Sequence, residues 1–82
     1  MATTRRVVVN AVVEVCGTDE GRLIDNATLQ DLAIDSLDLL EVAMIVEEEL
    51  GVVVEAEDFE DVETLGQTVA VFSQLQPTVV DD

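Results

Sequence analysis

The chain has 82 residues, a hydrophobic fraction of 49% and a formal net charge of −16, with nineteen aspartates and glutamates against three arginines and neither lysine nor histidine. This length and apolar content predict one small folded domain over residues 1–82, with an ordered core at about 5–75 and a flexible tail at 76–82. The charge argues against nucleic-acid binding and disfavours an anionic membrane, so basic protein surfaces are the expected partners.

The first predicted element covers residues 5–16, RRVVVNAVVEVC. Its six valines favour a strand on propensity alone. However, two polar residues lie four positions apart with Ala11 beside them, and most of the apolar residues fall on the opposite face of a helix. We therefore predict a helix that Thr3 or Thr4 caps and Gly17 ends.

Residues 17–34 begin with Gly17 and contain Gly21, three aspartates and several other polar residues, and this composition predicts a long loop. The loop also carries five larger apolar residues, too many for a free linker. We expect them to pack against the helices. They are Leu23, Ile24, Leu29, Leu32 and Ile34.

The clearest helical pattern runs from Ser36 to Leu50 and ends before Gly51. A buried stripe is predicted at spacings of three and four residues: Leu39, Val42, Ala43, Val46 and Leu50. A second face mixes large apolar groups with carboxylates, as a docking surface does: Leu37, Glu41, Met44 and Glu48.

Residues 55–63 hold six acids in nine positions and predict one or two turns of short helix. A last helix is capped by Thr64, extends to about Leu75 and is closed by Pro77, with Gly66 inside it costing about 1 kcal/mol relative to alanine. The predicted fold is all-α: a small four-helix bundle of three longer helices and one short helix, with a long packed loop between the first and second helices.

Ser36 stands between two acids at the start of the second predicted helix. No histidine or lysine is present to act as its general base, so neither a catalytic triad nor a Ser-Lys dyad can be built and we predict no enzymatic activity. Cys16 is the only cysteine, which excludes an intramolecular disulfide, and no metal site is expected. On local grounds alone, Asp35 and Asp38 form a variant of the capping box.

The stretch from Asp31 to Asp38, DLAIDSLD, with the acidic residues that follow it up to Leu50-Gly51, resembles the acyl carrier proteins of fatty-acid and polyketide synthesis. The resemblance extends over about residues 5–75. It implies that Ser36 carries a covalent 4′-phosphopantetheine arm, which a separate transferase takes from coenzyme A. It also implies that the arm presents acyl groups, as thioesters, to separate enzymes.

The same resemblance implies roles for further residues. Residues of the acidic helix would meet the transferase and basic-surfaced synthase enzymes such as a ketosynthase or an acyltransferase: Asp35, Leu37, Asp38, Glu41, Met44, Glu47 and Glu48. Four valines are candidates for lining the space that shelters the acyl chain, although ordinary core packing explains them equally well: Val42, Val46, Val62 and Val69.

The sequence departs from the family pattern at three positions. Ala33 replaces a usual glycine, which makes a positive φ harder there. Glu55 replaces a usual proline before the short helix, and Gly66 weakens the last helix. These departures suggest a conformationally loose region at about residues 52–66.

Two alternatives stay open at this point. One is an acidic helical interaction module without a prosthetic group, in which Ser36 is only a cap. The other is a peptidyl carrier protein, although such carriers usually have a glycine-rich run before the serine. The expected molecule is a free-standing monomer. We expect it to act in the cytoplasm, because the sequence has no apolar run of membrane-spanning length and no convincing export signal.

Overall fold

A computed structural model describes residues 3–75, and within them the fold is all-α. Three α-helices are present, α1 (Thr4–Cys16), α2 (Ser36–Leu50) and α3 (Leu65–Gln74), together with two short 3-10 turns at Glu20–Arg22 and Ala56–Phe59. The predicted short helix is therefore a single 3-10 turn, and a four-helix bundle is not confirmed. The predicted tail and Pro77 lie outside the described residues.

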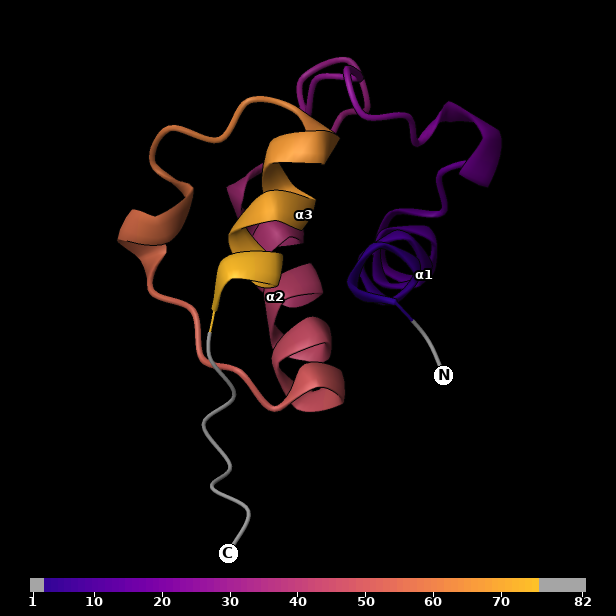
Figure 1. The fold of residues 1–82 in the computed structure, drawn as a ribbon. Helices are drawn as coiled ribbons and strands as arrows, with labels where there is room; N and C mark the ends of the chain where they lie inside the picture. Colours follow the sequence, from indigo (N-terminus) through magenta and orange to yellow (C-terminus); the bar gives the residue numbers. More distant parts are fainter. Residues whose placement is uncertain (1–2, 76–82) are drawn as a thin grey trace, which may run out of the picture.

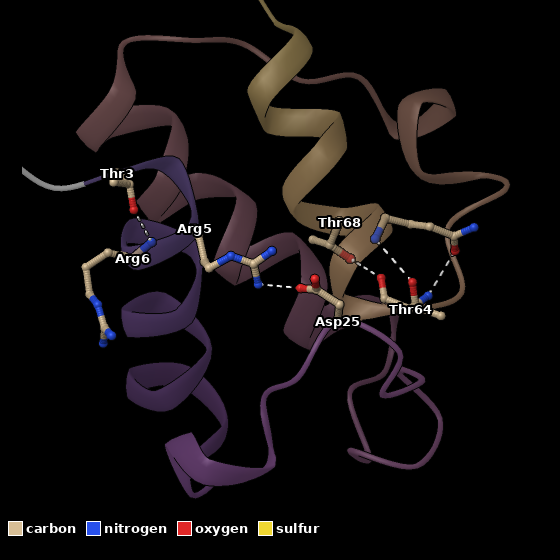
Figure 2. A network of polar contacts seen from close by, with 7 residues as sticks. Thr3, Arg5, Arg6, Asp25, Thr64 and Thr68 are labelled. Carbon is tan, nitrogen blue, oxygen red and sulfur yellow. Dashed lines mark hydrogen bonds and ion pairs between the residues drawn. The ribbon is translucent and has the colours of Figure 1, made fainter.

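The helix ends follow the capping signals of the sequence. Thr3, rather than Thr4, caps α1 by accepting a hydrogen bond from the Arg6 amide at 3.1 Å, and Gly17 ends the helix with a φ of +67°. Thr64 caps α3 in the same way, accepting from the Gln67 amide at 3.1 Å (Figure 2). Each cap satisfies a backbone group that has no partner inside the helix.

The core lies where α1 packs against both α2 and α3. In Figure 1, α1 is seen nearly along its axis, whereas α2 and α3 run along the plane of the view, so α1 crosses the other two helices. Ala11 is only 1% exposed, so the prediction that it shares the polar face of α1 is wrong. Contact with two helices requires a wider apolar face than contact with one.

The loop between α1 and α2 is packed, as predicted, although Ile24 is exposed. Leu23, Leu32 and Ile34 are buried, and Leu29 is half-buried. Figure 1 shows this loop passing over the start of α3. It is an element of the core rather than a free connection.

Three backbone hydrogen bonds of 2.9 Å join this loop to the start of α3. The Leu29 amide donates to the Glu63 carbonyl, and the amides of Leu65 and Gly66 donate to the carbonyls of Ala27 and Asp25. We call this set of three bonds the seam. It ties together two parts of the chain that are far apart in sequence.

The structure explains why position 66 is a glycine, which the sequence does not reveal. A Cβ atom at this position would lie 2.9 Å from the Asp25 carbonyl oxygen and 3.2 Å from the Asp25 Cβ. The expectation that Gly66 simply weakens α3 is therefore incomplete. Glycine allows the close backbone approach that the seam requires.

All three arginines interact with the same loop. Arg5 pairs with Asp25 (Figure 2), Arg6 pairs with Glu20 at 3.0 Å, and the Arg22 guanidinium donates to the Asp31 carbonyl at 3.3 Å. Because these contacts are largely exposed, each contributes little to stability. The positions of the arginines also make the charge uneven along the chain, because no basic residue follows Arg22.

Candidate functional site

Ser36 is the first residue of α2, directly after the N-cap Asp35. The Asp38 amide donates to the Asp35 carboxylate at 2.8 Å, and the Asp35 amide donates to the Asp38 carboxylate at 3.4 Å. The predicted capping box is thus present. Each carboxylate uses one oxygen in it, which leaves the other oxygen for solvent or for a basic partner.

The side chain of Ser36 is exposed, and its hydroxyl makes no hydrogen bond within residues 3–75. The amides of Ser36 and Leu37 likewise donate to no atom in this part of the chain, because they belong to the first turn of α2. The hydroxyl therefore lies beside open backbone donors at the positive end of a helix. This is a favourable place for a phosphate group.

Ala33, three residues before Ser36, adopts a φ of +58°. Its amide donates to the Gln30 carbonyl at 3.0 Å, and the next amide, of Ile34, donates to the Leu29 carbonyl at 2.9 Å. These bonds and the burial of Ile34 hold the turn in place. The sequence predicted that a positive φ would be unfavourable at an alanine, and the chain nevertheless adopts one here.

The predicted second face of α2 is exposed. Leu37 and Met44 are 65% and 61% exposed, and Glu41 and Glu48 are exposed beside them. Sequence reasoning missed Leu40, which is 58% exposed. Its spacing of three residues from Leu37 and four from Met44 was the signal that places it on this face.

Glu47 does not lie free on this face. It is half-buried, and its carboxylate accepts a hydrogen bond from the Val54 amide at 2.8 Å. A side chain predicted to contact partners therefore also makes a hydrogen bond within the fold.

A hollow of about 320 Å³ lies between α2 and the segment that follows it. Ser36 is part of its lining, so the hydroxyl borders the hollow. One wall is a stripe of α2 and the other comes from the segment around the Ala56–Phe59 turn. The lining residues are Ser36, Leu39, Leu40, Ala43, Glu47, Val54, Ala56, Phe59 and Glu60.

None of the four valines predicted to line an acyl site belongs to this hollow. Val42, Val46 and Val69 are buried in the core instead. Val62 is half-buried and borders a different hollow, between residues 28–30 and 62–64. A valine-rich core and a ligand site have the same apolar composition, so the sequence does not distinguish them.

Acidic side chains dominate the electrostatics around Ser36. Their effect reaches Cys16, at the end of α1. Partial burial raises the pKa of its thiol, and the negative charges of Asp38, Asp35 and Glu41 raise this pKa further. Cys16 is therefore held as a thiol near the start of α2. Within residues 3–75, no three potential ligands form a metal-binding cluster, and no helix has the length and apolar character to cross a membrane.

One comparison with known proteins bears on this site. A family model described as a phosphopantetheine attachment site matches residues 6–72. The match covers all three helices except the ends of α1 and α3, and it includes Ser36, the seam and the hollow.

Proposed function

Since the chain belongs to the phosphopantetheine attachment-site family, whose members carry this prosthetic group covalently, we propose that it is an acyl carrier protein with Ser36 as its attachment residue. The observation that carries this proposal is the Ser36 hydroxyl. It is exposed, it has no hydrogen bond within the described residues, and it borders both the open amides of α2 and an apolar hollow.

The family is a carrier rather than a catalytic domain, and its members work with a phosphopantetheinyl transferase and with partner enzymes. In the proposed loading step, the Ser36 oxygen forms a phosphoester bond while the pyrophosphate bond of coenzyme A breaks and adenosine 3′,5′-bisphosphate leaves. The transferase supplies the base and the magnesium ion. The chain itself supplies an accessible hydroxyl and a helix end that favours the resulting phosphodiester.

When attached, the arm offers a terminal thiol that holds an acyl group as a thioester. The hollow beside Ser36 is the proposed shelter for this acyl group, because side chains of α2 and of the Ala56–Phe59 segment give it a largely apolar lining. Burial of apolar acyl carbon there is favourable at roughly 0.8 kcal/mol per methylene group. An acyl group suits this lining better than a polar peptidyl group does.

The exposed face of α2 is the proposed docking surface for partner enzymes. Leu37, Leu40 and Met44 supply apolar contacts, and Glu41 and Glu48 flank them with negative charge. Helix α2 carries five acidic residues and no basic one, so its exposed face attracts basic surfaces. The attraction raises association rates and weakens with salt.

The proposal is tested by measuring intact mass after incubation with coenzyme A, magnesium and a broad-specificity phosphopantetheinyl transferase. We expect the parent chain to gain one phosphopantetheine and Ser36→Ala to gain none. Ser73→Ala is the matched control, because Ser73 is also an exposed helical serine and is the only other serine in the chain. Modification of Ser36→Ala, or an unmodified parent that is folded, would contradict the assignment and favour an interaction module.

A further inference from the structure

Glu47 fixes the way in which the chain leaves α2. Its backbone carbonyl accepts hydrogen bonds from the amides of Gly51 and Val52, at 2.8 and 3.2 Å. Its carboxylate reaches two residues further and accepts from the Val54 amide at 2.8 Å, in a partly buried position. One residue thus holds three of the four amides that follow the helix.

The wall of the hollow that faces α2 is attached to the rest of the molecule at few points. Residues 53–61 are hydrogen-bonded to the adjoining Val62, whose amide donates to the Phe59 carbonyl. Apart from that turn, the bond from the Val54 amide to Glu47 is the only hydrogen bond that links this segment to the rest of the described chain. At the other end, the Phe59 ring packs against Phe72 of α3, with ring centroids 5.6 Å apart. The wall is therefore fixed near Val54 and near Phe59.

Both fixed residues line the hollow, and so does Glu47 itself. Glu47 follows Ser36 by eleven residues of α2, which corresponds to about 16 Å along the helix axis. The attachment residue and the Glu47 bond therefore lie at opposite ends of one stripe. Loss of the bond would release the wall at the end that is remote from Ser36.

We propose that Glu47 is a positioning residue for the acyl shelter, holding Val54 so that the segment 53–61 stays in place as the wall of the hollow. This inference rests on the proposed carrier function and assigns Glu47 an internal role instead of a partner contact. A hydrogen bond to a charged, partly buried acceptor is among the stronger bonds a side chain makes, so a single carboxylate suffices to hold the wall.

The first test measures hydrogen exchange at the Val54 amide in the chain without an arm. In Glu47→Ala the amide loses its acceptor, and we expect exchange about tenfold faster or more, which corresponds to the loss of one such bond. Glu47→Gln keeps a neutral acceptor oxygen and should stay closer to the parent than Glu47→Ala does. Glu49→Ala removes the same charge from a nearby exposed position that has no proposed role, so it should leave Val54 unchanged.

The second test loads each variant with an octanoyl arm from octanoyl-coenzyme A and measures thioester cleavage by hydroxylamine. A sheltered thioester is cleaved slowly, because hydroxylamine reaches it only when the shelter opens. We expect faster cleavage in Glu47→Ala, by up to about the same tenfold factor. Glu49→Ala should cleave at the parent rate, and Glu47→Gln should stay closer to the parent than Glu47→Ala does.

Equal Val54 exchange in Glu47→Ala and the parent would overturn the proposal. Cleavage rates that follow charge alone, with Glu47→Gln and Glu49→Ala matching Glu47→Ala, would overturn it as well. Unchanged exchange at the buried Val42 and Val46 amides of α2 confirms that each variant is folded. The Val54 measurement needs no arm. A chain that fails to load at Ser36 therefore contradicts the carrier function. The role of Glu47 in holding the segment 53–61 can still be tested in that chain.

Discussion

Residues 17–35, between α1 and α2, are joined to the molecule by the backbone bonds of the seam, by arginine contacts and by the buried side chains of Leu23, Leu32 and Ile34. Residues 53–61, between α2 and α3, contain no buried residue and are joined through one side-chain hydrogen bond and one ring contact. We call these segments the first and second connections.

The difference between the connections matches their positions around Ser36. The first connection leads directly into the N-cap of α2, so its fixed backbone determines the position of Ser36. The second connection forms a wall of the hollow. A weakly attached wall can move to admit or release a group, whereas the proposed attachment residue benefits from a fixed position.

The substitution with the largest expected effect disrupts the seam of the first connection. Gly66→Ala places a Cβ 2.9 Å from the Asp25 carbonyl oxygen, so either the seam or the start of α3 must shift. Overpacking of this kind costs about 1–3 kcal/mol, and the better helix propensity of alanine returns up to about 1 kcal/mol. We expect a net loss of about 1–2 kcal/mol in the free energy of unfolding, measured by urea denaturation.

Gly21→Ala is the control for this substitution, since a Cβ at Gly21 meets only the Asp19 carboxylate, at 3.7 Å. It should change stability by less than about 0.5 kcal/mol. A parent-like Gly66→Ala protein would show that the seam yields without cost and that the first connection is not rigid.

Hydrogen exchange sharpens the comparison itself. The seam amides of Leu29, Leu65 and Gly66 are bonded between distant segments, whereas the bonded amides of residues 58–62 donate only within their own turn. We expect the latter to exchange at least about tenfold faster, a difference of about 1.4 kcal/mol in opening free energy. Equal protection of the two groups would refute the loose second connection. Part of the region that the sequence marked as loose, residues 63–66, belongs to the seam and should be protected.

The smallest expected effect concerns the turn before Ser36. Ala33→Gly removes the steric penalty of a φ of +58°, and the greater flexibility of glycine in the unfolded chain offsets part of the gain. We expect stability to rise by about 0.5–1 kcal/mol, again by urea denaturation. Ala27→Gly, in the same connection but without a positive φ, should lower stability by a similar amount. A destabilised Ala33→Gly protein would mean that the turn is not strained.

The sequence by itself determined the features that depend on neighbours along the chain. Helix α2, its capping box, its exposed face and the position of Ser36 follow from spacings of three and four residues and from the residue types at helix ends. The family resemblance rests on the same local stretch, and the match over residues 6–72 confirms it.

Only the tertiary structure decided the features that join distant residues. The contact of Gly66 with Asp25, the bond from Glu47 to Val54 and the lining of the hollow leave no periodic trace in the sequence. A glycine in a helix and a glutamate on an acidic face have ordinary local explanations, and buried valines fit a core or a ligand site equally well. Their roles depend on which backbone or side chain the fold brings within contact distance, because hydrogen bonds and steric contacts act only over such short distances.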